Sequence, residues 1–248
     1  MRKNYNILLL LGIFAIFIIW FISSLIINNS LVLPSIKDVL LSLKDILLSC
    51  TTYLILLKTF LKLILVMVAS LLIALTLALL SSKTKGFESF IKPIMVLFKT
   101  IPVIAIIIFL LISFGRDLSP YIMTSLVVIP LMYEGLLTSI KSINKELLDD
   151  LKTLSNTNWL VIKNFYIPLI MNFVLMTITQ SFGMGLKVMI MGEFIAQPNG
   201  TIGYILQLER SYLNSAAILS WSILLIIIVL IVEIIVSKIS KYNKVSIV

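Results

Sequence analysis

The sequence predicts an all-α, polytopic membrane protein with six transmembrane helices and both chain ends in the cytoplasm (N-in/C-in). The chain of 248 residues is 60% hydrophobic and has a mean hydropathy of +1.15. Soluble domains contain roughly 45–50% apolar residues. Most side chains of this protein must therefore contact lipid, or one another, inside a bilayer.

Six apolar runs can each cross a bilayer as a helix, which takes about 20 residues. They cover residues 7–27, 60–80, 93–113, 120–137, 169–191 and 216–236. Gly115 and Pro120 indicate a tight turn between the third and fourth runs. The first run could also be a signal peptide, but its full length and the lack of an A-x-A-like cleavage site favour a retained span. Residues 1–6 and 237–248 are then short cytoplasmic ends.

The basic residues predict the orientation, because cytoplasmic segments of membrane proteins carry an excess of lysine and arginine. With the N-terminus inside, the outer segments hold few: Lys37, Lys44, Lys58, Arg116 and Arg210. The inner segments hold many more: Arg2, Lys3, Lys83, Lys85, Lys92, Lys141, Lys145, Lys152, Lys163, Lys238, Lys241 and Lys244. Because the positive charge is dispersed along one membrane face, it indicates contact with the lipid bilayer and argues against nucleic acid as a partner.

The outer segment 28–59 contains a second kind of helix. Its apolar face consists of Ile36, Val39, Leu40, Leu43 and Leu47. Lys37, Asp38, Lys44 and Asp45 occupy the other side. The stretch is too short and too charged to span, so it predicts an interfacial helix on the outer surface.

Several chemistries are excluded by what the sequence lacks. It contains no histidine and one cysteine, Cys50, so a histidine base, an intrachain disulfide and a thiolate metal cluster are ruled out. It contains no G-x-x-x-x-G-K-[ST] phosphate loop. We expect a protein that is not an enzyme, binds no cofactor and takes any energy from a partner. A membrane-embedded enzyme is disfavoured further by the scarcity of clustered intramembrane carboxylates.

A charged segment at about residues 138–168 separates the fourth and fifth runs. Its charged residues are Lys141, Lys145, Glu146, Asp149, Asp150, Lys152 and Lys163. Apolar residues recur at steps of three and four, which puts them on one face of a helix: Ile140, Ile143, Leu147, Leu151 and Leu154. The pattern predicts an amphipathic helix outside the membrane that binds a soluble partner, with a solvated linker as the alternative. Pro168 then opens the next span, where a helix tolerates proline best.

Polar residues inside the spans are candidates for a translocation path or gate. Gln180 lies among small residues of the fifth run, where helix packing is the alternative explanation. Lys187 and Glu193 flank its outer end and could line a gate, pair across a dimer interface or extend to the headgroups. Glu134 and Glu233 are expected at the membrane interfaces, and Lys99 as a basic anchor.

Several motifs, in order along the chain, resemble the permease subunits of binding-protein-dependent ABC importers of the nitrate/sulfonate/taurine branch. The charged segment resembles their cytoplasmic EAA loop at Glu146, Leu147, Leu154, Trp159 and Pro168. The runs Leu33-Pro34-Ser35 and Lys99-Thr100-Ile101-Pro102 resemble the L-P-S-P and R-x-I-P motifs. The residues Lys187-Val188, Gly192-Glu193 and Gly200-Thr201-Ile202-Gly203-Tyr204 resemble W-K-V, A-E and G-L-G-Y.

This resemblance implies a type I ABC importer permease fold with its core at about residues 60–236. It also implies a dimer of ABC ATPase subunits that bind ATP and magnesium, an extracytoplasmic solute-binding protein and a second permease copy, in a bacterial cytoplasmic membrane. Coupling to the ATPase would use Glu146, Leu147, Asp149, Asp150, Leu151, Leu154 and Trp159. The solute would be a small anion or a vitamin precursor, moved by alternating access.

The sequence departs from the family pattern at four places. The E-A-A triplet is Asp149-Asp150-Leu151, its following glycine is Ser155, and two prolines are replaced by Val103 and Asn172. The alternative function is a membrane scaffold or accessory subunit that binds a soluble partner without transporting a solute.

Overall fold

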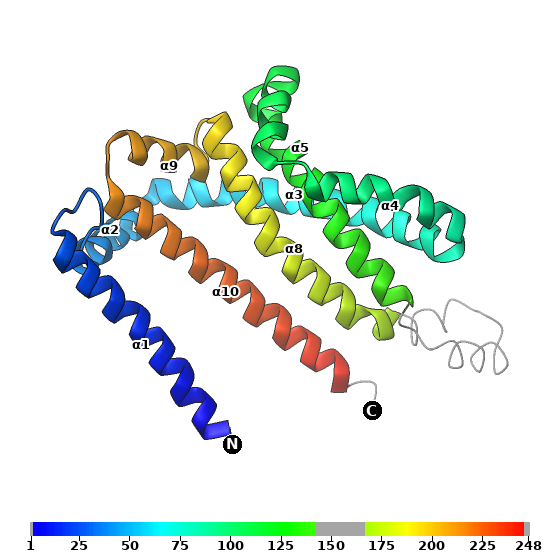
Figure 1. Cartoon of the computed structure of the whole chain (residues 1–248), viewed down its shortest axis with the longest axis horizontal. Helices are drawn as coiled ribbons and strands as arrows, with labels where there is room; N and C mark the ends of the chain where they lie inside the picture. Colours follow the sequence, from blue (N-terminus) through cyan, green and yellow to red (C-terminus); the bar gives the residue numbers. More distant parts are fainter. Residues whose placement is uncertain (1, 142–166, 246–248) are drawn as a thin grey trace.

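The computed structural model describes residues 2–141 and 167–245, and their regular structure is entirely helical (Figure 1). The helices in this part of the chain are α1 (Arg2–Ile27), α2 (Ile36–Leu48), α3 (Cys50–Lys83), α4 (Lys85–Thr100), α5 (Val103–Lys141), α8 (Ile167–Ala196), α9 (Ile202–Ser211) and α10 (Ser215–Val245). The all-α prediction is confirmed. Pro168 lies in the first turn of α8, as its position in the sequence predicts.

Within the described ranges, four helices are long and apolar enough to cross a membrane. They are α3, α5, residues Val174–Ala196 of α8 and residues Ser215–Ile239 of α10. The apolar stretch Leu11–Ile27 of α1 is slightly shorter. Each of these five helices contains one of the six predicted runs. The third predicted run is not contained in a single helix.

The predicted third span, residues 93–113, is not one helix. Helix α4 ends at Thr100 and α5 begins at Val103, because Ile101 is extended with φ −64° and ψ 130°. Its neighbour Pro102 explains this conformation, since the proline ring disfavours helical backbone in the residue before it. The predicted turn is confirmed at Gly115, whose φ of 74° kinks α5, whereas Pro120 lies inside the helix beyond the kink.

Helices α3, α5 and α8 form the core through close backbone approach. A Cβ atom added at Gly192 of α8 would lie 3.0 Å from Cα of Pro120 in α5. One added at Gly185 would lie 3.1 Å from the Val128 side chain, also in α5. Small residues at these crossings let the helices pack by van der Waals contact, which is the main attraction between helices in lipid.

The two sides of the helix bundle differ, as Figure 1 shows. The N-terminal ends of α1 and α8 lie toward one side, together with the C-terminal ends of α5 and α10. Helices α2 and α9 lie toward the other. The basic-residue distribution predicts that the first side, where α5 ends and α8 begins, is cytoplasmic.

Helix α2 is the predicted outer helix, but only part of its expected apolar face is covered. Ser35 caps the helix by accepting a hydrogen bond from the Asp38 amide at 3.2 Å. Val39 is buried against α10, where the Ser220 hydroxyl donates to its carbonyl at 2.9 Å. Leu40 and Leu47 are exposed, because α10 and α3 contact the helix along a narrower stripe than the periodicity predicts.

Candidate binding groove between helices α8 and α10

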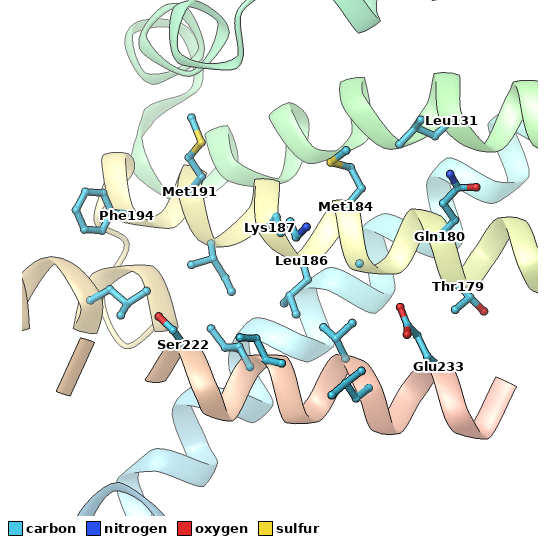
Figure 2. A pocket seen from close by; sticks show the side chains of 17 residues that line it. Leu131, Thr179, Gln180, Met184, Leu186, Lys187, Met191, Phe194, Ser222 and Glu233 are labelled. Carbon is cyan, nitrogen blue, oxygen red and sulfur yellow. The ribbon is translucent and has the colours of Figure 1, made fainter. Parts of the chain in front are cut away.

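A groove of about 730 Å³ runs between α8 and α10, with apolar walls and three strongly polar side chains (Figure 2). Gln180 and Lys187 come from α8, and Glu233 comes from α10. Its volume is in the range of small-molecule sites, roughly 300–1,000 Å³. The groove could therefore hold a small solute whose polar groups face these residues.

The periodicity of α8 gives the helix two different faces. The groove face carries Gln180, Met184, Lys187 and Met191 at steps of three and four. The next face around the helix, displaced by one residue at each position, is buried and carries Ser181, Gly185, Val188 and Gly192. The two hypotheses for this part of α8, helix packing and a polar path, therefore apply to adjacent faces of the same helix.

Lys187 and Glu233 both lie within apolar helices long enough to cross a membrane, with Glu233 toward the C-terminal end of its candidate span. Lys187 precedes the end of α8 by nine residues, about 13 Å at 1.5 Å per residue. In Figure 2 the Glu233 carboxylate points from α10 toward α8, near Thr179. Ionisable groups inside a span are costly against lipid and usually face a cavity or a partner. Glu233, expected near the end of its span, also lines the groove, which the sequence analysis did not predict.

Glu193 lies outside this groove, in a buried hydrogen-bond network at the outer end of α8. Its side chain is 0% exposed. The Thr59 hydroxyl of α3 lies 3.1 Å from one carboxylate oxygen, and the Gly203 amide of α9 donates to the other at 3.2 Å. Thr59 also accepts a hydrogen bond from the Ile202 amide at 3.1 Å. Glu193 therefore joins three helices and does not extend to the headgroups.

Two ion pairs join α4 to α5 toward the cytoplasmic side. Lys99 pairs with Glu134 at 2.6 Å, and Lys141 pairs with Glu88 at 2.6 Å. Both pairs are partly exposed. The sequence predicted an anchor at Lys99 and an interfacial Glu134, but not their pairing, because residues in different helices share no local pattern.

The predicted coupling residues lie outside the described part of the chain, in the segment between α5 and α8. They are Glu146, Leu147, Asp149, Asp150, Leu151, Leu154 and Trp159. Within the described residues, no group of three or more acidic or cysteine side chains could hold a metal ion.

Residues 70–243 match the model of the family described as binding-protein-dependent transport system inner membrane component. The chain belongs to this family. It is therefore a permease subunit of an ABC importer, a multi-pass membrane protein that is itself a non-catalytic component of the transporter.

The permease also resembles a solved chain of the MetNI methionine ABC transporter, determined in inward-facing conformations. The TM-score is 0.60 at 13% sequence identity, and the match covers 79% of this chain and 99% of the other. This similarity concerns the fold. No match is found among curated proteins. Family and fold together favour transport over the scaffold alternative.

Proposed function

We propose that this permease moves a small solute by alternating access through a path that includes the α8–α10 groove. The observation that carries the proposal is the placement of Gln180, Lys187 and Glu233 along one groove within the membrane-spanning helices. Such groups are retained at membrane depth where they face a water-filled path or a substrate. The ammonium of Lys187 favours a solute with an anionic group, which agrees with the resemblance to the nitrate/sulfonate/taurine branch.

The proposed assembly contains two permease copies, two ATPase subunits and an outer solute-binding protein in a bacterial cytoplasmic membrane. The ATPase subunits bind ATP and magnesium, and the permease itself needs no cofactor. The segment 142–166 binds the ATPase through Leu147, Leu151 and Leu154, with Glu146, Asp149 and Asp150 at the rim and Trp159 alongside. Because α8 follows this segment directly, ATPase closure is transmitted to the helix that carries Gln180 and Lys187.

The test is uptake of labelled nitrate, taurine and short alkanesulfonates by cells that express the permease with its co-encoded ATPase and binding protein. Lys187→Met keeps much of the side-chain length and removes the charge, so we expect the uptake rate to fall at least tenfold. Lys238→Met, near the cytoplasmic end of α10, is the matched control and should transport normally. Normal uptake by the Lys187→Met variant at native expression would exclude this groove from the path.

A further inference from the structure

Helix α9 lies across one end of the groove between α8 and α10. Leu206 of α9 lines the groove together with Phe194, which lies near the C-terminal end of α8. A Cβ atom added at Gly203, in the first turn of α9, would lie 2.4 Å from the Phe194 amide nitrogen. Figure 2 shows Phe194 at one end of the groove and Gln180 toward the other. Helix α9 therefore forms part of the groove wall at the end that faces the outer side.

The last turn of α9 places Arg210 over the same phenylalanine. The guanidinium carbon Cζ lies 5.8 Å from the centre of the Phe194 ring, and the arginine side chain is exposed. A guanidinium that stacks on an aromatic ring still has N–H groups along its edges, which can bind an anion. The outer end of the groove thus carries a positive charge on an aromatic support.

The charge of Arg210 is not neutralised by a carboxylate within residues 2–141 and 167–245, where both ion pairs join α4 to α5. The carboxylate of the adjacent Glu209 accepts a hydrogen bond from the Asn214 side chain at 2.8 Å. Nη1 of Arg210 lies 3.5 Å from the side-chain oxygen of Gln207, which is a weak contact. An anion that approaches from the outer side would therefore meet a guanidinium with donors to spare.

Arg210 and Lys187 follow one another along the groove. Phe194, Met191 and Lys187 recur at steps of three and four on the groove face of α8, and all three line the groove. The seven residues from Phe194 to Lys187 span about 10 Å of helix. The groove thus has one positive charge over its outer end and a second one about two turns further in, with apolar side chains between them.

From this arrangement, which rests on the proposed function, we infer that Arg210 is the entry site for an anionic solute, occupied before the solute reaches Lys187. A positive charge at the mouth of an apolar groove raises the local concentration of anions. The planar guanidinium also presents two parallel N–H groups to the oxygens of an oxyanion, which a lysine ammonium does not. Phe194 holds the guanidinium over the groove, and Lys187 receives the anionic group inside it.

Two other roles would explain an exposed arginine at this position. A basic residue in the last turn of a helix interacts favourably with the helix dipole. An arginine near a membrane surface can also bind the phosphate of a lipid headgroup, which is the same chemistry as binding an anionic solute. Either role would change the stability of the protein without changing the rate of solute uptake, so the two measurements together distinguish them from an entry site.

The experiment uses the permease–ATPase complex in proteoliposomes, the purified co-encoded binding protein and, as the probe, whichever of labelled nitrate, taurine or ethanesulfonate the native complex takes up. Arg210→Gln removes the charge, and we expect the initial uptake rate to fall by about tenfold. Arg210→Lys keeps the charge without the planar fork and should give an intermediate rate. The affinity of the binding protein for the complex should be unchanged in both variants. Arg116→Gln, an exposed arginine of α5 that does not line the groove, is the matched control and should transport at the native rate.

A native uptake rate in Arg210→Gln would overturn the entry site, and so would equal losses in Arg210→Gln and Arg210→Lys, because the charge would then have no role. A loss of uptake that follows weaker docking of the binding protein or a lower midpoint of thermal unfolding would overturn it as well. If Lys187→Met lowers uptake and Arg210→Gln does not, only the entry site fails. Normal uptake by Lys187→Met would contradict the proposed function, and the entry site with it.

Discussion

Thr59 of α3 and Glu193 of α8 lie 134 residues apart in the sequence, yet the Thr59 hydroxyl lies 3.1 Å and 3.2 Å from the two carboxylate oxygens of Glu193. Both side chains are fully buried. The first turn of α9 completes the contact through the amides of Ile202 and Gly203. The network fixes the outer end of α8 against two other helices, independently of the groove.

Replacing Thr59 by valine tests this network. The change preserves the shape of the side chain but removes the hydroxyl donor to Glu193 and the acceptor of the Ile202 amide. A buried polar group that loses its partner costs about 1–3 kcal/mol. We expect a lower midpoint of thermal unfolding in detergent or nanodiscs. Thr76→Val, at an exposed position on the same helix, should have little effect. Equal midpoints for the two variants would show that the network contributes nothing measurable.

Replacing Gly192 by alanine should destabilise the protein, whereas replacing Gly183 on the same helix by alanine should be tolerated. An alanine Cβ at Gly192 would lie 3.0 Å from the Pro120 backbone and 2.8 Å from Met123 Cε, which forces α5 and α8 apart. Overpacking of this kind costs about 1–3 kcal/mol. The nearest atom to a Cβ at Gly183 is 3.9 Å away, an ordinary contact. Unfolding measurements on the two alanine variants compare them directly, and a Gly192→Ala protein as stable as Gly183→Ala would contradict the close helix approach.

The Glu88–Lys141 ion pair should respond to charge reversal as a pair. Glu88→Lys and Lys141→Glu each place like charges together, and the double variant restores opposite charges at the same positions. Because both side chains are partly exposed, the coupling energy should be small, at most about 1 kcal/mol. A double-mutant cycle on unfolding stability measures this energy.

Lys92 lies on α4 between the two pairs and belongs to neither, so Lys92→Glu combined with Lys141→Glu is the control for this cycle. That combination should show no comparable rescue. Additive effects of the Glu88 and Lys141 changes would mean that the pair does not hold α4 to α5.

The segment between α5 and α8 should bind the ATPase through its leucines. Leu147→Glu with Leu154→Glu places charge on the predicted apolar face, and we expect the co-encoded ATPase to be lost when the tagged permease is purified. Lys152→Glu alters the polar face and should leave the association intact. Equal recovery of the ATPase with all chains would remove Leu147 and Leu154 from the coupling surface, and no recovery with the native chain would favour the scaffold alternative.

Much of the fold could be predicted from local patterns. Apolar length located the spans that became α3, α5, α8 and α10, and Gly115 located the kink in α5. The break at Ile101 and Pro102 was also present in the sequence, where Lys99 and Thr100 precede it, but the high average hydropathy of residues 93–113 led to the prediction of one span. Gln180 and Lys187 were predicted separately as path or gate candidates, and only the structure shows that both line one groove.

The sequence by itself determined the all-helical, membrane-spanning class and the resemblance to importer permeases, and it predicts the side on which the charged segments lie. These properties follow from the hydropathy and charge of each segment, which do not depend on the other segments that the segment contacts in the fold. The tertiary structure decided that Glu193 is buried with Thr59, that Glu233 shares a groove with Lys187, and that Lys99 pairs with Glu134. Each of these relationships depends on which helices become neighbours and in what rotation, and a polar group in a low-dielectric interior is stabilised or penalised according to the partner it finds there.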